Sequence, residues 1–90
     1  MRKIESQMLE AVNNGKTWSK DNTEVYPIVG GMEVRLHGHP IAKVDEYGQV
    51  KVDLYTLRNW PTNTTKSRLR ALGVDIKTKG GVIHLDDKPV

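Results

Sequence analysis

The residues best suited to chemistry in this sequence are cations and small hydroxyls concentrated in residues 56–81. That segment holds six Lys or Arg against one Asp, a net charge of +5, whereas the remaining chain sums to −2. Cations neutralise phosphates and small hydroxyls let a backbone approach them, so the segment is suited to binding a polyanion. A solvated basic surface produces the same asymmetry, and charge alone leaves both interpretations open. The candidate contacts are Thr64, Thr65, Lys66, Ser67, Arg68, Arg70, Lys77 and Lys79.

Other groups that could do chemistry lack the partners that such chemistry needs. His37 and His39 offer imidazoles to a metal, but His84 is distant in sequence and further ligands are missing, so structural or surface histidines are expected. The paired carboxylates of residues 45–46 and 86–87 are neighbours at predicted turns, where solvation is usual. Without a nucleophile–base pair, a metal cluster or a cofactor loop, we expect neither an enzyme nor a bound cofactor.

Length and composition set the class of protein. Ninety residues, 37% hydrophobic and 28% charged, suit a single globular domain spanning residues 1–90. The absence of Cys excludes disulfides and thiolate sites. The sequence contains no apolar run of the roughly 18 residues that a membrane span requires, and its first residues do not form the apolar region of a signal peptide. We therefore expect a cytoplasmic protein with no membrane partner, whose oligomeric state stays open.

Hydrophobic periodicity predicts an N-terminal helix followed by a β-meander. Apolar residues recur at helical spacing over residues 3–13, and Gly15 can end the helix. From residue 23 onward, apolar and polar residues alternate as they do in strands. Gly and Pro within residues 37–40, and Gly within residues 46–49, indicate tight connections. We expect a meander of three antiparallel strands.

Two short helices and a hairpin are predicted to position the basic segment. Asp53 is a suitable N-cap for the first helix, which Pro61 ends. Hydroxyl and amide side chains at residues 62–64 offer caps for the second helix, and Gly73 indicates its end. The glycines at residues 80–81 predict the turn of a C-terminal β-hairpin. The expected architecture is α+β, with a helix-turn-helix-like pair and a winged-helix-like hairpin.

The aromatic residues are few, with two Trp, three Tyr and no Phe. In so short a chain, Trp18 and Trp60 are both expected to fill the core in preference to stacking on bases. Tyr47, at a predicted turn tip, is the exception and a candidate for a surface contact.

Two resemblances to known families include residues of the basic segment. TTKSRL at residues 64–69 resembles the recognition helix of LacI-type helix-turn-helix regulators, although the predicted β-meander differs from their all-helical headpiece. LHGHPIA at residues 36–42 and WPTNTTKSRLRALG at residues 60–73 resemble small uncharacterised proteins of tailed bacteriophages, including T7-like ones. The second resemblance implies a phage protein acting in the host bacterial cytosol, on nucleic acid or on a host factor. It implies no catalytic residues.

These observations together predict a nucleic-acid-binding accessory protein that uses the basic helix and hairpin, with DNA expected over RNA. The alternative is a phage modulator or inhibitor that binds a bacterial host protein or defence complex through the basic face or an edge strand. A third interpretation is a site for a small anionic nucleotide, which requires an enclosed pocket such as one between subunits.

Overall fold

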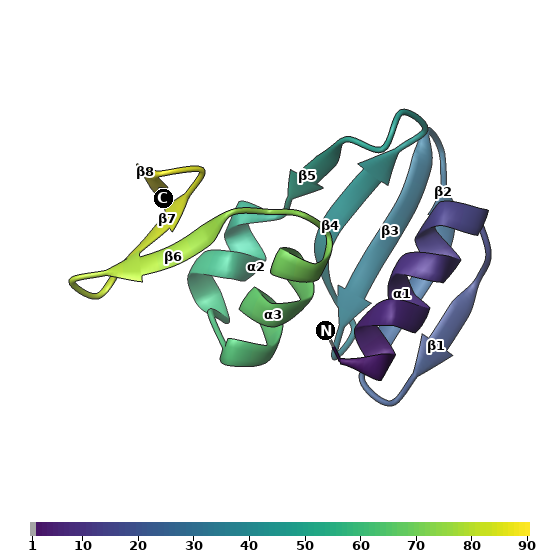
Figure 1. Ribbon diagram of the computed structural model, residues 1–90, viewed down its shortest axis with the longest axis horizontal. Coiled ribbons are helices and arrows are strands. Elements are labelled where there is room, and N and C mark those ends of the chain that lie inside the picture. The colour runs from purple at the N-terminus through teal and green to yellow at the C-terminus, as the bar shows by residue number, and fades with distance from the viewer. Residues whose placement is uncertain (1) are drawn as a thin grey trace.

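The computed structural model describes residues 2–90 and shows an α+β fold (Figure 1). An N-terminal helix precedes a five-stranded antiparallel sheet, and two further helices lead to a three-stranded C-terminal sheet. The helices are α1 (Lys3–Asn14), α2 (Leu54–Asn59) and α3 (Asn63–Ala71). The strands are β1 (Trp18–Lys20), β2 (Thr23–Ile28), β3 (Gly31–Leu36), β4 (His39–Asp45), β5 (Val50–Val52), β6 (Ile76–Lys79), β7 (Val82–Leu85) and β8 (Lys88–Pro89).

The main sheet is a meander in the order β1-β2-β3-β4-β5, so β1 and β5 are its edges. Five strands replace the three expected. β1 has only three residues, too few for alternation to be distinct, and the alternating residues 23–36 form two strands, β2 and β3, joined by a turn that includes Gly30. The turn between β3 and β4 consists of His37 and Gly38, with φ of 52° and 77°. Two successive positive φ values give the hairpin turn whose twist matches the strands, as the sequence predicted here.

Gly31 of β3 pairs with Asp45 of β4, where the two backbones leave no room for a side chain. A Cβ on Gly31 would overlap the carbonyl oxygen of Val44, so any larger residue would have to push the two strands apart. Glycine is therefore required at this position for β3 and β4 to pair as they do.

Helix α1 covers one face of the main sheet (Figure 1). Met8, Ala11 and Val12 are buried and pack in one apolar cluster with Val25 and Val34 of the sheet. The helix ends where the sequence predicted, because the residue after it, a glycine, has a left-handed backbone and caps the last carbonyls.

Helices α2 and α3 lie beside β4 and extend the same apolar cluster through Leu57 and Leu69. Both predicted caps are confirmed: the Asp53 carboxylate accepts from the Thr56 N–H at 3.0 Å, and the Thr62 hydroxyl accepts from the Thr65 N–H at 3.1 Å. Across residues 2–90, no helix has the length and apolar character needed to cross a membrane.

The C-terminal sheet is held to the body by Ile76, which is buried at the start of β6. The predicted hairpin turn is confirmed, since Gly80 and Gly81 join β6 to β7 with φ of 55° and 78°. A further turn at Asp86 and Asp87 adds β8, which was not expected from sequence because a two-residue strand has no periodicity.

Candidate nucleic-acid interface

The structure corrects the expected orientation of Arg68, which points into the protein and not toward a ligand. Its side chain is 4% exposed, and Nη1 lies 2.8 Å from the Glu5 carboxylate in an ion pair. Its Nε donates to the Thr23 hydroxyl at 3.1 Å. The Ser67 hydroxyl donates to the same Glu5 oxygen at 2.6 Å, so two predicted contact residues instead join α3 to α1. A buried, paired cation adds no net charge to the surface.

The environment of Glu5 keeps this carboxyl ionised. Burial alone would raise the pKa of Glu5, but hydrogen bonds from Ser67 and Arg68 outweigh that effect and hold the pKa below its ordinary value. Ion pair and hydrogen bonds together make a polar clamp between α1 and α3, which we call the Glu5 clamp. It is defined by Glu5, Thr23, Ser67 and Arg68.

Thr65 is also buried and so cannot face a ligand directly. It is 2% exposed, and its hydroxyl lies 3.0 Å from that of Thr62, the residue that caps α3. Its neighbour Thr64 is half-buried. Of the two threonines predicted as contacts, Thr65 therefore serves the helix cap, and Thr64 alone keeps access to solvent.

Lys66 and Arg70 occupy the outer side of α3, since residues four apart lie on one helix face. Lys66 Nζ donates to the Thr78 hydroxyl at 2.9 Å. Arg70 Nε and Nη2 donate to the Ile76 carbonyl at 3.2 and 3.0 Å. These contacts place β6 alongside α3. Among residues 2–90, no carboxylate forms an ion pair with Lys66, Arg70 or the exposed Arg58 of α2.

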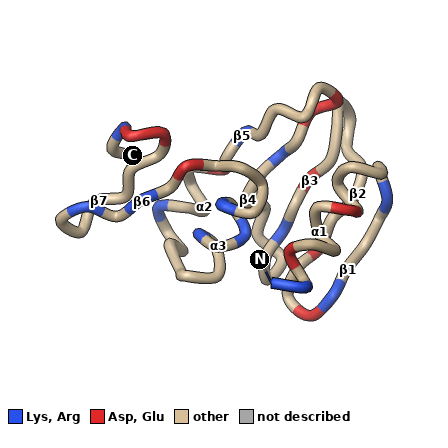
Figure 2. The backbone as a smooth tube through the Cα atoms, in the orientation of Figure 1, with Lys and Arg blue, Asp and Glu red and all other residues tan. Residues whose placement is uncertain are grey.

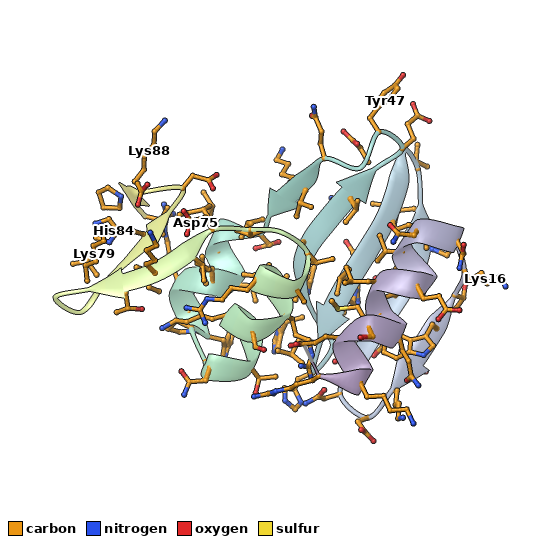
Figure 3. The ribbon with its side chains drawn as sticks, in the orientation of Figure 1. Lys16, Tyr47, Asp75, Lys79, His84 and Lys88 are labelled. Atoms are coloured by element: carbon orange, nitrogen blue, oxygen red, sulfur yellow. The ribbon has the colours of Figure 1, made fainter. Side chains whose placement is uncertain are left out.

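Lys77 and Lys79 lie on the opposite side of the hairpin from α3. Successive side chains of a strand point to opposite faces, and it is Thr78 of the same strand that contacts Lys66. The two lysines instead approach Asp87, at 3.7 and 3.8 Å, in exposed ion pairs. Figure 3 labels Lys79 among the side chains of this outer hairpin face. Lys77 and Lys79 therefore do not share a face with Lys66 and Arg70 of α3.

The net positive charge nevertheless belongs to the C-terminal part of the chain. With the buried Glu5–Arg68 pair set aside, residues 54–90 carry six Lys or Arg against three Asp, a net +3. The preceding residues then hold seven cations and seven carboxylates and are neutral. Figure 2 shows Lys and Arg in blue along α2, α3 and the C-terminal hairpin. Residues 54–74 contain no Asp or Glu at all.

The structure also contains an exposed aromatic cluster, which was not predicted from sequence. Trp60 is 43% exposed, and its ring stacks on His39 with centroids 4.4 Å apart and planes 20° from parallel. Tyr55 meets Trp60 edge-on at 6.3 Å. The expectation that both tryptophans fill the core is thus wrong for Trp60, whereas half-buried Trp18 does pack against the core. Tyr47 is exposed at its turn tip, as expected.

A second polar cluster occupies the sheet face opposite α1. Glu33 is 7% exposed and accepts hydrogen bonds from the Tyr26 hydroxyl and from Arg35 Nε, the latter at 2.9 Å. Burial would raise the pKa of Glu33, but these hydrogen bonds hold the pKa below its usual value. Burial and the hydrogen bond to Glu33 raise the pKa of Tyr26. At neutral pH the carboxyl is ionised and the phenol protonated, so the Tyr26 hydroxyl donates to a carboxylate and links β2 to β3.

The three histidines lie in separate environments. His37 Nε2 lies 3.4 Å from the Asn22 amide nitrogen, and His39 belongs to the aromatic cluster. His84 Nδ1 lies 3.0 Å from the Val82 carbonyl. The part of the chain that the structure describes holds no group of three His, Asp or Glu arranged to bind a metal ion.

Comparison with known proteins places the chain among phage proteins. A sequence profile of the Kyanoviridae Gp96 protein family matches residues 1–88. Comparisons with curated proteins and with solved structures find no match. The profile confirms the resemblance to phage proteins, while the narrower likenesses to T7-like proteins and to LacI-type regulators stay predictions. Since the match extends over nearly all of its length, the chain belongs to the Kyanoviridae Gp96 protein family.

Proposed function

We propose that this phage protein binds nucleic acid through a helix-pair surface, defined by Arg58 of α2 and by Thr64, Lys66 and Arg70 of α3. The observation that carries the proposal is the absence of Asp and Glu from residues 54–74, which leaves these cations unopposed by a carboxylate on either helix. DNA is the proposed form, because two short helices separated by a turn have the order of a helix-turn-helix. Arg68 does not belong to this surface, since it is buried in the Glu5 clamp.

The cations of α3 keep donors available for phosphate. A guanidinium has five N–H donors and an ammonium has three. Arg70 directs two of its nitrogens to the Ile76 carbonyl, and Lys66 makes one hydrogen bond to Thr78. The remaining donors can bind phosphate oxygens while these contacts hold the side chains in place, which lowers the entropy cost of binding.

The test compares two double substitutions that change the net charge equally. Arg58→Glu with Lys66→Glu reverses two cations of the helix-pair surface, whereas Lys16→Glu with Lys20→Glu reverses two exposed cations at the β1 end of the molecule. In a mobility-shift titration at low salt, the first pair should weaken DNA binding at least about tenfold. Each phosphate contact that is lost reduces the number of counterions released when the protein binds. The second pair should weaken DNA binding far less.

Equal losses in the two double variants would show that binding follows net charge alone and not the helix-pair surface. Failure of the parent protein to shift single-stranded DNA, duplex DNA or RNA at low salt would exclude the proposed function altogether. Circular dichroism of each variant verifies that the fold is kept.

A second candidate is the binding of a bacterial host protein at the edge strand β5. The Asp45 N–H donates to the Gln49 carbonyl and the Asp53 N–H donates to the Ile41 carbonyl. By alternation, the backbone groups of Val50 and Val52 then point away from β4, toward the open edge. Beside this edge lies a groove whose lining combines the apolar side chains of Leu54, Leu72, Val74 and Leu85 with charged Lys51 and Asp86. An added strand could pair with β5 and place apolar side chains in the groove.

Proline at position 50 tests the second candidate, because it removes an N–H that points outward and proline is tolerated at sheet edges. Val50→Thr keeps the N–H with a side chain of similar shape and is the matched control. The edge strand binds a host protein if that protein is captured after nuclease treatment by the parent and by Val50→Thr, but not by Val50→Pro. Loss of all captured protein on nuclease treatment would favour the nucleic-acid function.

A further inference from the structure

The exposed aromatic cluster of His39, Tyr55 and Trp60, which we call the aromatic platform, has no structural role that requires its exposure. The core is formed by aliphatic residues and methionine, and the platform lies outside it. Tyr55 is 70% exposed and Trp60 43% exposed, so large ring surfaces face water. The platform contains two of only five Trp and Tyr residues in the chain. Leaving such rings in solvent forgoes the burial that would stabilise the fold, and this favours a role in binding.

The rings are held in place before any ligand arrives. They come from three parts of the chain: β4 begins at His39, α2 carries Tyr55, and Trp60 follows α2 directly. The Trp60 N–H donates to the Thr56 carbonyl at 2.8 Å, and the Trp60 carbonyl accepts from the Thr62 N–H at 2.9 Å. Both backbone groups of Trp60 are therefore fixed, and its ring is fixed by the stack on His39.

Cations lie close to the platform along the chain. Arg58 lies three residues after Tyr55 on α2, a spacing that makes the two side chains neighbours on the helix surface. The short link from Trp60 leads directly into α3, whose outer side carries Lys66 and Arg70. No Asp or Glu occurs anywhere between Tyr55 and Arg70 in the sequence. Ring faces beside unopposed cations match the two parts of a nucleotide, a flat base and an anionic phosphate.

We infer that the aromatic platform stacks on the unpaired bases of single-stranded DNA while Arg58 and Lys66 hold its phosphates. This inference rests on the proposed function and narrows its substrate class. It keeps the helix-pair surface but replaces insertion of α3 into a duplex groove, the usual use of a helix-turn-helix, with contacts to a single strand. Base faces are accessible only in a single strand, because in a duplex each base is covered by its neighbours. The outward position of Lys77 and Lys79 also favours a single strand, since it leaves α3 without a cationic hairpin beside it to hold a flanking duplex backbone.

The experiment measures the affinity of the full chain for a labelled dT oligonucleotide of about 15 nucleotides, a length within the span of a small basic module. A dT·dA duplex and an rU oligonucleotide of equal length are the comparison probes. Single-stranded DNA should bind more tightly than the duplex. Trp60→Ala should weaken single-strand binding roughly 10- to 100-fold, the usual loss for one stacked base, and Trp60→Phe should retain most of the affinity.

The control is Tyr47→Ala, which removes a ring that is 83% exposed, more than Tyr55 or Trp60, at the turn between β4 and β5. It should leave binding unchanged. Tyr55→Ala serves as the second platform variant if Trp60→Ala lowers the melting temperature, because Tyr55 is more exposed and contributes less to packing.

The outcomes separate the inference from the proposed function. If Arg58→Glu with Lys66→Glu weakens binding while the platform variants do not, the protein binds nucleic acid but does not stack on its bases. Tighter binding of the duplex than of the single strand also overturns the inference. If rU binds more tightly than dT, the platform recognises RNA and the assignment to DNA is wrong. If no probe binds the parent protein, both proposals fail.

Discussion

Glu5 shows how one side chain on a helix can set the pH range in which this protein is stable. It is buried, it pairs with Arg68 at 2.8 Å, and its pKa is held below the ordinary carboxyl value by the hydrogen bonds of the Glu5 clamp. Glu33 on the other sheet face has a lowered pKa for the same kind of reason. A carboxyl with a lowered pKa in the folded state stabilises the fold above its unfolded pKa, near 4.5, and that stability is lost as the pH falls through the folded pKa.

We therefore predict that the free energy of unfolding changes little between about pH 7 and pH 5.5 and falls steeply below about pH 4.5. Glu5→Gln should be less stable at pH 7 and should show a shallower fall, since it cannot take up the proton. Urea unfolding at a series of pH values measures both. Parallel curves for the parent and Glu5→Gln would mean that Glu5 titrates with an ordinary pKa in the folded protein.

Glu5 and Arg68 were hard to assign from sequence, because a charged residue on a helix is usually solvated. A signal did exist: Glu5 precedes Met8 and Val12 at helical spacing, in line with the buried stripe of α1. Arg68 lies between the buried Thr65 and Leu69 of α3 in the same way. The sequence does not show that these two charged residues, 63 positions apart, are in contact. Only the fold brings them together.

Element boundaries were predicted well where a local chemical cause exists. The caps Asp53 and Thr62 and the turn glycines Gly15 and Gly80 act within a few residues of their own position, so their effects could be derived from sequence. The face of the hairpin that meets α3 could not be derived from sequence. Alternation shows that Lys77 and Lys79 share a face, but it does not show which face packs against α3. That choice depends on the long-range burial of Ile76.

The Glu5 clamp links α1 to α3 through an ion pair and hydrogen bonds. Arg68→Met should cost about 3–5 kcal/mol, because it leaves the Glu5 carboxylate buried without its charge partner. For a domain of this size the melting temperature should fall by at least about 12 °C. Adding Glu5→Gln to Arg68→Met should restore part of the loss, since the uncompensated charge is then removed.

Thermal unfolding of the parent, both single variants and the double variant completes this cycle. The expected non-additivity is large, because the two residues are in direct contact. Additive losses would show that the two side chains act independently. Under conditions in which the Arg68→Met variant is folded, it should bind DNA as tightly as the parent protein, because Arg68 contacts no ligand in our proposal.

The whole molecule divides into a neutral part and a cationic part, once the buried pair is set aside. The α1-covered sheet supplies most of the core, and the helix pair packed beside β4 carries both the unopposed cations and the aromatic platform. The C-terminal sheet holds Lys77 and Lys79 on its outer face, where Asp87 partly offsets them. Charge on the helix pair and charge on the hairpin should therefore contribute unequally to binding.

Salt dependence measures this difference directly. Each phosphate contact to single-stranded DNA contributes about −0.7 to the slope of log affinity against log salt, so Arg58, Lys66 and Arg70 predict a slope of about −2. Arg58→Gln should make the slope shallower by about 0.7. Lys77→Gln with Lys79→Gln removes two charges but should leave the slope nearly unchanged, because these side chains face away from α3 and approach Asp87. If the slope becomes shallower by more in Lys77→Gln with Lys79→Gln than in Arg58→Gln, the nucleic acid binds on the outer face of the hairpin instead.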